Sequence, residues 1–300
     1  MKALLLIVLS AVLAAPSLLA AGPTLELDAQ IVWTDRSPRF GGFSGLEIQD
    51  QGRALLTISD RASWARAQLE RDEDGTLQRI RLTGIGPLLS IKGTLLDGLD
   101  TDAEGLAMDR QGTAYVSFEH FHRVRRYPKI DGPAEYVPSP PEFSDFQPNS
   151  GLEALAIDAD DVLYAIPERS GAETRPFPVF RLKQGRWDQQ MSIPRRGKLL
   201  VTDADFGPDG RFYLLERHFQ FVGGFAIRIR SFSLGATGFE DEHTLLETRL
   251  GDNLLDNMEG ISVWQDVLGQ IRVTLISDDN FNLLQRTLIS EYILHPDSQE

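Results

Sequence analysis

The sequence predicts an all-β protein that repeats one antiparallel unit five times. Three observations support this prediction. An acidic motif recurs along the chain, each copy is followed by two apolar strands with a turn signal between them, and no long helical period appears after the N-terminal segment. The leading acids of the copies are Glu47, Glu104, Glu153, Asp203 and Glu259. A spacing of about 50 residues with internal turns is typical of a β-propeller, in which each unit forms one blade.

The N-terminal segment, residues 1–21, is predicted to be a secretory signal peptide. Lys2 gives a basic start, residues 3–20 are almost wholly apolar, and small residues follow at Ala20-Ala21-Gly22. An uncleaved membrane anchor is the alternative, but Pro16 and the small residues favour cleavage. No later stretch approaches the ~20 apolar residues of a membrane span. We therefore expect residues 22–300 to form one secreted or periplasmic domain without a membrane span.

Within the repeats, turn signals separate short apolar runs. Asp/Gly hairpin loops are predicted at residues 50–52, 109–112 and 208–210, and strands at 114–118, 162–166 and 271–276. Further strands are expected at 123–127 and 225–234, towards the outside of their blades. Residues 139–150 contain three prolines and are predicted to be a surface loop.

The repeat spacing favours five blades, with six as the alternative if one repeat is degenerate. The last unit has only 41 residues after Glu259. We expect residues 25–34 to supply its missing strand and to close the ring from the N-terminus, because closure removes sheet edges that would otherwise aggregate.

The overall charge excludes some classes of partner. The chain has 44 acidic and 30 basic residues, a net charge of −14. A nucleic-acid binder and a protein that docks on anionic lipid both need a basic surface, so neither fits. Cysteine is absent, which excludes disulfides, thiolate metal sites and cysteine nucleophiles.

The acids of each repeat are expected to lie in pairs at one end of its hairpin, because the midpoint of each pair falls at or near a turn. The predicted pairs are Glu47 with Asp60, Glu104 with Glu119, Glu153 with Glu168, Asp203 with Glu216, and Glu259 with Asp278. Like charges opposite one another are unfavourable unless something compensates them. A hard cation would do so, since Ca²⁺ takes carboxylate oxygens as ligands. We therefore predict that some of these ten acids bind Ca²⁺ at one mouth of the propeller.

A basic residue follows the trailing acid in four of the five units. These residues are Arg61, His120, Arg169 and Arg217. They are candidates for binding a phosphate or carboxylate group, which arginine holds in a bidentate manner. In the alternative interpretation, each base pairs with an acid of the neighbouring blade and the ring is purely structural. The two interpretations are compatible.

Several motifs resemble the exported phytase-like domain family of bacteria, whose members are labelled "esterase-like activity of phytase". The motifs are Phe40-Gly41-Gly42-Phe43-Ser44-Gly45-Leu46-Glu47, Ser59-Asp60-Arg61, Asp102-Ala103-Glu104-Gly105-Leu106-Ala107, Ser117-Phe118-Glu119-His120, Gly151-Leu152-Glu153-Ala154-Leu155 and Asn257-Met258-Glu259-Gly260-Ile261. The resemblance runs from about Phe40 to Ile293 and implies a secreted propeller.

By analogy with propeller phytases, the resemblance implies that the glutamate ring holds calcium and that Arg61, Arg169 and Arg217 meet the phosphoryl oxygens. Two departures from the phytase pattern stand out: the chain has no lysine-rich phosphate pocket, and its fourth unit has Asp203-Ala204-Asp205 in place of Glu-Gly. The acid-lined channel also resembles that of lactonase and gluconolactonase propellers, in which one Ca²⁺ polarises a lactone carbonyl.

These features predict a calcium-dependent hydrolase of phosphate esters or other small esters, with a small anionic ester as substrate. Glu104 or Glu153 is the candidate general base, and the arginines would stabilise developing negative charge. A lactonase-like hydrolase is one alternative. A non-catalytic binding module with a structural acidic ring, which would bind a ligand or a partner in the cell envelope, is the other.

Overall fold

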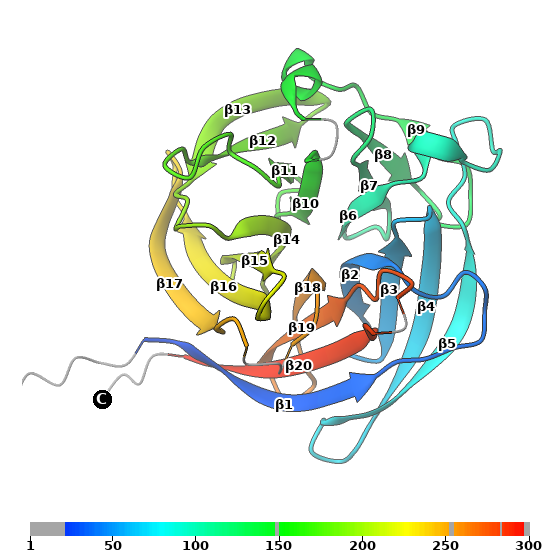
Figure 1. The fold of residues 1–300 in the computed structure, drawn as a ribbon, viewed down its shortest axis with the longest axis vertical. Coiled ribbons are helices and arrows are strands. Elements are labelled where there is room, and N and C mark those ends of the chain that lie inside the picture. Colours follow the sequence, from blue (N-terminus) through cyan, green and yellow to red (C-terminus); the bar gives the residue numbers. More distant parts are fainter. Residues whose placement is uncertain (1–21, 148–149, 252–254, 283, 297–300) are drawn as a thin grey trace, which may run out of the picture.

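The chain folds into five four-stranded antiparallel sheets arranged as a propeller (Figure 1). The computed structural model describes residues 22–147, 150–251, 255–282 and 284–296. The predicted signal peptide lies outside these residues. The described residues contain no helix long and apolar enough to cross a membrane. The prediction of an all-β propeller with five blades is confirmed, and the six-bladed alternative is excluded.

Each blade is named here by its order around the ring. Blade I contains β2 (Phe43–Gln49), β3 (Ala54–Ser59), β4 (Ser63–Arg71) and β5 (Leu77–Pro87). Blade II contains β6 (Ala103–Met108), β7 (Ala114–Phe118), β8 (Arg123–Tyr127) and β9 (Glu135–Tyr136). Blade III contains β10 (Leu152–Ile157), β11 (Leu163–Pro167), β12 (Phe177–Lys183) and β13 (Arg186–Ile193). Blade IV contains β14 (Leu200–Phe206), β15 (Phe212–Gln220), β16 (Gly224–Leu234) and β17 (Phe239–Glu247). Blade V contains β18 (Met258–Gln265), β19 (Ile271–Ser277), β20 (Leu288–His295) and β1 (Thr24–Val32).

The N-terminal strand closes the ring, as predicted. Strand β1 pairs antiparallel with β20 from Thr24 opposite His295 to Val32 opposite Leu288. Strands from both ends of the described chain therefore share blade V, and β1 forms the outer edge of that blade. This closure joins the blades into one ring without a free gap between the first and last repeats.

The first strand of each repeat lies innermost. Strands β2, β6, β10, β14 and β18 surround the centre of the ring in Figure 1, and each contacts the innermost strands of its neighbours. The predicted strands at 114–118 and 123–127 coincide with β7 and β8. Those at 225–234 and 271–276 differ from β16 and β19 by one residue at one end, and that at 162–166 is shifted by one residue from β11. The proline-rich loop carries one short 3-10 helix, η2 (Pro141–Asp145).

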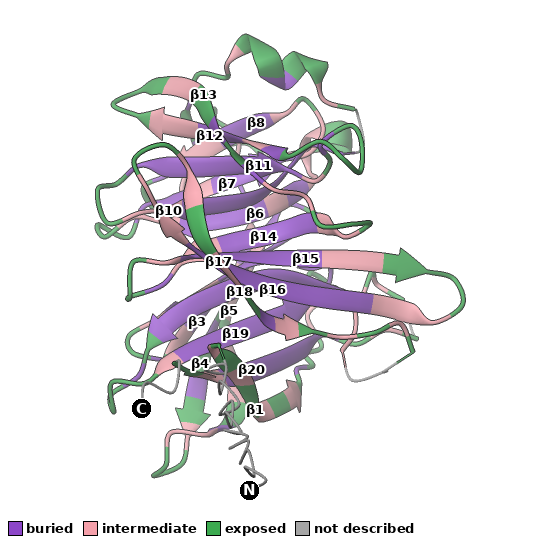
Figure 2. Ribbon diagram, turned by 90° about the vertical axis from the view of Figure 1, so that its left-hand side faces the viewer, coloured by how far each residue is buried: buried purple, intermediate pink, exposed green. Residues whose placement is uncertain are grey.

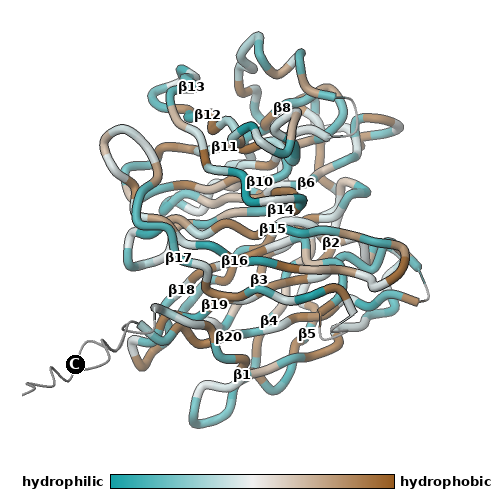
Figure 3. Tube along the Cα trace, turned by 60° about the vertical axis from the view of Figure 1, so that its left-hand side comes forward, coloured by the Kyte–Doolittle hydropathy of each residue, from teal (hydrophilic) through white to brown (hydrophobic). Residues whose placement is uncertain are grey.

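The core consists of apolar clusters between adjacent blades. Between blades I and II, for example, Leu56 and Ile58 pack with Phe118 and Tyr127. Figure 2 shows buried residues along the middle of the strands and exposed residues at the turns, and Figure 3 shows short hydrophobic and hydrophilic segments alternating along the chain. Because each cluster joins two blades, the residues that set the spacing between inner strands affect the whole ring.

Gly105 is one such spacing residue. A Cβ atom at this position would overlap the backbone carbonyl of Glu153 and would lie 2.8 Å from Oγ of Ser117. We expect Gly105→Ala to destabilise the fold by roughly 1–3 kcal/mol through overpacking. Urea unfolding monitored by tryptophan fluorescence measures the change. Gly112→Ala would be a poor control because its φ is +82°; Ala107→Gly, on the same strand, controls for altered strand propensity. An unchanged unfolding midpoint for Gly105→Ala would contradict close contact between β6 and β10.

Candidate functional site

A β-bulge near the start of every innermost strand turns one residue out of the regular pairing. The register shifts lie between Ser44 and Leu46 in β2 and at the matching places in β6, β10, β14 and β18. A bulge re-aims a side chain and is common next to functional sites. When the five strands are aligned on their partners in the next strand, the matching position at the bulge holds Ser44, Glu104, Glu153, Thr202 and Glu259. In β2, Ser44 itself is opposite Ile58 and the unpaired residue is Gly45.

The register corrects the predicted pairing of acids within a hairpin. Ala103 is opposite Phe118, so Glu119 faces Asp102 and not Glu104. The backbone amide of Glu119 donates to the carbonyl of Asp102 at 2.9 Å. The same amide-to-carbonyl bond recurs in other blades, from Asp60 to Gly42, from Glu168 to Gly151 and from Asp278 to Asn257. The leading and trailing acids are therefore offset by two residues in blades II, III and V, and by five in blade I, where Glu47 lies beyond Gly42. Symmetry about the turn did not show the offset because it depends on the exact turn register and on the residue that the bulge adds to one strand.

Acids from four blades nevertheless gather at one end of the ring, which we call the mouth cluster. Its members are Asp60, Asp102, Glu104, Glu119, Glu153, Glu168, Glu259 and Asp278, together with Arg217. Burial first, and then the charges of Glu153 and Asp102, hold the pKa of Glu104 well above its usual value. Burial and then Glu168 and Glu259 do the same to the pKa of Glu153. Such mutual repulsion is what a bound cation would relieve.

Three side chains of blade II come closest to a set of metal ligands. One ligand atom from each of Asp102, Glu119 and His120 lies within 4.8 Å of the other two, and these are the residues of the described chain that meet this test. Nδ1 of His120 is 2.8 Å from Oδ2 of Asp102. Burial, followed by the nearby Asp102, raises the pKa of Glu119 to about 7. Asp102 was not among the predicted site residues, although it stands in the same motif as Glu104.

Blade IV contributes a base where the other blades contribute an acid. By register, Leu200 is opposite Arg217 and Val201 is opposite Glu216, so Arg217 occupies the trailing position. Its guanidinium donates to Glu259 and Asn257 of blade V. Burial by itself lowers the pKa of Arg217, but the charges of Glu259 and Glu153 outweigh it. The pKa is therefore raised above its usual value, and the side chain stays charged. The structural alternative predicted that each of the four bases pairs with an acid of the neighbouring blade. Among the contacts of these four described residues, only Arg217 makes such a pair.

Glu216 does not join the mouth cluster. Its carboxylate is fully buried and accepts hydrogen bonds from Arg228 and Arg230 at 2.8–3.1 Å. The predicted pairing of Glu216 with Asp203 is therefore corrected, because Asp203 is opposite Leu215. Glu216 is one residue before Arg217, which occupies the trailing position, and neighbouring residues of a strand point to opposite faces of the sheet.

Glu47 and Asp203 lie further along the inner strands and bind backbone amides. Glu47 accepts from the amide of Met108 at 2.8 Å, and Asp203 accepts from that of Ile261 at 2.9 Å. Asp205 does the same with Val263 at 2.6 Å. Each carboxylate thereby ties its inner strand to that of the next blade. Glu47 stands at the register position of Asp205, three residues beyond Ser44. Its predicted place in one ring with Glu104, Glu153 and Glu259 is therefore corrected.

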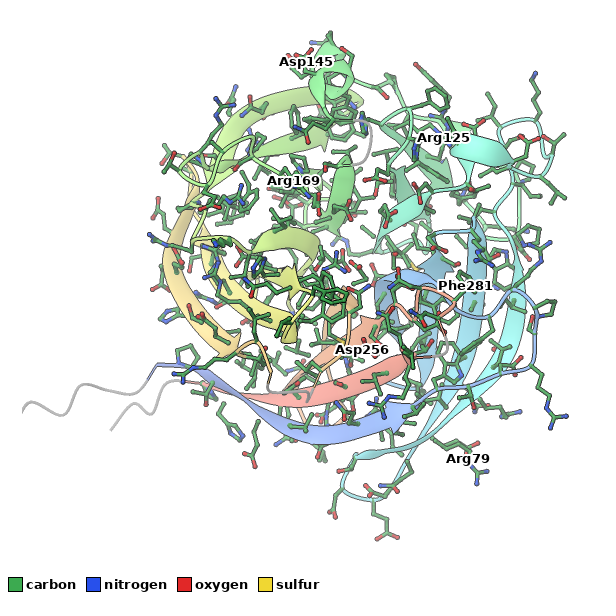
Figure 4. All side chains as sticks on the ribbon, in the orientation of Figure 1. Arg79, Arg125, Asp145, Arg169, Asp256 and Phe281 are labelled. Carbon is green, nitrogen blue, oxygen red and sulfur yellow. The ribbon has the colours of Figure 1, made fainter. Side chains whose placement is uncertain are left out.

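The remaining predicted bases lie at the rim of the mouth. The guanidinium of Arg61 stacks 3.2 Å from the ring centre of Phe281, and Arg169 donates to Glu168 at 2.8 Å. Figure 4 shows Arg169 closer to the middle of the ring than Asp145 or Arg79. His120 and Arg169 each pair with an acid of their own blade, which differs from the predicted network between blades.

The mouth cluster should make the cation-free protein less stable as the pH rises. Burial raises the pKa of Asp278 to about 7 and that of Asp60 to about 6. A carboxyl group with a raised pKa stabilises the fold while it is protonated, and this contribution is lost as the pH rises through those values. In EDTA, we expect a lower melting temperature at pH 8 than at pH 5.

The matched comparison is a double variant, Asp60→Asn with Asp278→Asn, which should flatten this pH dependence. Asp241, Glu242 and Asp266 have lowered pKa values, so they stabilise the fold when ionised. Their contribution is lost only at a pH below the range of the comparison. Differential scanning calorimetry across pH 5–8 measures the effect. A melting temperature that rises with pH in EDTA would contradict the geometry of the cluster.

Residues 38–281 match the phytase-like family, described as "Esterase-like activity of phytase". The chain belongs to this family. The predicted resemblance is thereby confirmed. No curated protein matches the sequence.

Solved structures similar to this phytase-like chain share its fold. An aldose sugar dehydrogenase from Streptomyces coelicolor, in its PQQ-bound form, is 13% identical with a TM-score of 0.52, and the match covers 92% of this chain and 99% of that one. An α-L-arabinofuranosidase from Podospora anserina, in complex with cellotriose, is 11% identical with a TM-score of 0.51, covering 93% and 98%. At these identities the likeness extends to the fold alone.

Proposed function

We propose that the protein is an exported, cation-dependent hydrolase of phosphate esters or other small esters, with its active site in the mouth cluster. The observation that carries the proposal is the approach of Asp102, Glu119 and His120 to within 4.8 Å, beside further carboxylates whose pKa values are raised. Membership of the phytase-like family supports hydrolysis of an ester bond. Export is proposed from the apolar N-terminal segment with its small-residue exit.

The donor atoms of the mouth fit a divalent cation. Carboxylate oxygens suit Ca²⁺, and the His120 imidazole also suits Mn²⁺ or Zn²⁺. Asp102, Glu119 and His120 would hold the cation, and when bound it would supply Lewis-acid polarisation of the scissile bond. Calcium is our first proposal because carboxylates outnumber imidazoles in the cluster.

Glu104 is the better placed of the two candidate bases. Both carboxylates interact with Glu119, but only Glu104 also interacts with Asp102, whereas Glu153 lies nearer Glu168 and Arg217. Oγ of Ser44 donates to Oε2 of Glu104 at 3.3 Å, which orients the carboxylate. A carboxylate with a raised pKa accepts a proton from water more readily near neutral pH. Glu104 therefore takes the proton of the attacking water, with Glu153 as the alternative base.

Basic residues would bind the substrate and stabilise negative charge. Arg217 is partly buried and stays charged, so its guanidinium can stabilise charge that develops at the mouth. Arg61 and Arg169 are more exposed and are proposed to meet an anionic group of the substrate as it enters.

The test combines cation binding with activity. Purified mature protein is titrated with Ca²⁺, Mn²⁺ and Zn²⁺ by calorimetry, and then assayed on 4-nitrophenyl phosphate, 4-nitrophenyl acetate and a δ-lactone with and without EDTA. We expect one cation to bind and to support hydrolysis of one of these substrates. The lactone arm tests the lactonase-like alternative. Absence of binding by all three cations, with no hydrolysis, would overturn the proposal.

A non-catalytic binding role is the second candidate, favoured by one feature. The tip of the β15–β16 hairpin exposes Phe219, Phe221 and Val222, and Phe221 is 94% exposed. Exposed apolar groups at a loop tip suit contact with another molecule. This role would replace the first if the cation binds and raises the melting temperature but none of the substrates is hydrolysed.

A further inference from the structure

A cavity of about 620 Å³ opens beside His120 on the same face as the mouth cluster. It lies between the connection that enters blade II, the β7–β8 turn and the proline-rich loop that enters blade III. Apolar side chains form most of its lining: Leu99, Phe121, Pro140, Pro141, Phe143 and Phe146. The lining contains no lysine or arginine. Its volume is within the range of small-molecule sites, roughly 300–1,000 Å³.

The walls of the cavity are anchored to the core. Phe143 is buried, and its ring packs edge-on against Phe180 and Trp187, with centroids 5.2 and 5.3 Å away. Nε1 of Trp187 donates to the carbonyl of Pro138 at 2.6 Å, which fixes the start of the loop. A cavity held in this way is formed before a ligand arrives, so binding costs little ordering of the chain.

His120 links the cavity to the mouth cluster. Its ring lines the cavity, while Nδ1 contacts Asp102 at 2.8 Å. Arg123 supports this turn, because its guanidinium donates to the carbonyls of His120 and Asp100 at 2.5 and 2.7 Å. A molecule whose ester group reaches Asp102 and Glu119 would therefore extend its next several atoms along His120 into apolar surroundings.

We propose that this cavity binds the apolar acyl chain of a carboxylic ester whose ester bond is cleaved at the mouth cluster. The inference rests on the proposed function and narrows its substrate class. In the reaction, water adds its hydroxyl to the acyl carbon, the bond from that carbon to the alcohol oxygen breaks, and the oxygen takes a proton. No oxidant or reductant is needed. A polyphosphorylated sugar alcohol would find no lysine or arginine in this largely apolar lining, so such a substrate is disfavoured here.

The first test is chain-length dependence. Each methylene that enters an apolar cavity contributes about 0.8 kcal/mol at full burial. We expect kcat/KM to rise at least tenfold from 4-nitrophenyl acetate to 4-nitrophenyl octanoate in the presence of the bound cation. Phe121→Asn removes an aromatic ring from the rim at a position with φ of +55°, which asparagine tolerates well. This variant should reduce the octanoate-to-acetate ratio of kcat/KM at least threefold.

Leu268→Asn is the matched control, since Leu268 is also an exposed apolar residue but lies in the β18–β19 turn, outside the cavity lining. It should leave the octanoate-to-acetate ratio unchanged. A flat chain-length profile, or an equal loss in both variants, would overturn the inference.

A second measurement does not depend on hydrolysis. Binding of 4-propylphenol is measured by calorimetry in EDTA for the native protein and for the double variant Leu99→Gln with Phe121→Asn. We expect binding that weakens at least fivefold in the double variant. If 4-propylphenol binds but no ester is cleaved, the proposed function fails and the apolar site remains. If esters are cleaved without a chain-length preference and 4-propylphenol does not bind, the cavity inference fails and the proposed function remains.

Discussion

Glu216→Gln should destabilise the folded protein by about 3–5 kcal/mol, the usual cost of breaking a buried ion pair by removing one partner. The Glu216 carboxylate and the Arg230 guanidinium are both fully buried, and Arg228 is nearly so. A neutral amide leaves two buried positive charges sharing less negative charge. Arg230 keeps Glu242 at 3.0 Å, which limits the loss but does not remove it. Urea unfolding at pH 7 measures the change.

The control for this variant is Glu240→Gln. Glu240 is exposed on β17 of the same blade, so the same chemical change should alter stability by less than about 0.5 kcal/mol. The comparison also tests the prediction of Glu216 as a metal ligand. A structural carboxylate loses stability in the presence and absence of Ca²⁺ alike. If Glu216→Gln left stability unchanged in EDTA but abolished Ca²⁺ binding, the ion-pair assignment would be wrong.

The prediction of a ring of acids from sequence succeeded where the repeat kept one pattern and failed where a single residue changed the register. Glu104, Glu153 and Glu259 follow the motif, and all three reach the mouth cluster. In blade IV the motif is Asp203-Ala204-Asp205, and the bulge lies before Asp203. Sequence spacing counts residues, but it does not show which of them is extruded from the pairing. Which residue is extruded depends on contacts with the second strand, and a register shift of one residue moves a side chain to the other face of the sheet.

The closing strand and the cavity illustrate the same distinction. Ring closure could be predicted from the sequence because the last repeat lacks one strand and residues 25–34 are suited to supply it. The cavity beside His120 could not, because its walls come from three separate connections, and the sequence does not show how these pack against one another. The proline content of residues 139–150 predicted a loop but carried no signal for where that loop packs. Phe143, which fixes it, reads in the sequence as an ordinary apolar residue.

Glu119→Gln should reduce the affinity for the bound cation by roughly 100-fold or more and remove most of the hydrolytic activity. Glutamine keeps the size of the side chain and one oxygen, but it removes the charge, and the number of charged ligands sets the affinity of oxygen-based sites. The loss should exceed the 10–100-fold typical of residues that only support a ligand. Isothermal titration calorimetry measures the affinity, and hydrolysis of the preferred ester at saturating cation measures what activity remains.

Two further variants separate a ligand from a residue that merely adds negative charge. Glu73→Gln, on the exposed β4–β5 turn, changes the net charge by the same amount and should leave the affinity within twofold. Asp102→Asn should resemble Glu119→Gln, because the two carboxylates belong to the same group of ligand atoms. Removing the Glu119 charge also relieves its repulsion with Asp102. Because the pKa of Glu119 is raised to about 7, Glu119→Gln should be at least as stable as the native chain in EDTA at pH 8. A variant that binds the cation with native affinity would remove Glu119 from the site, and one that loses stability in EDTA would show that its carboxylate is structural.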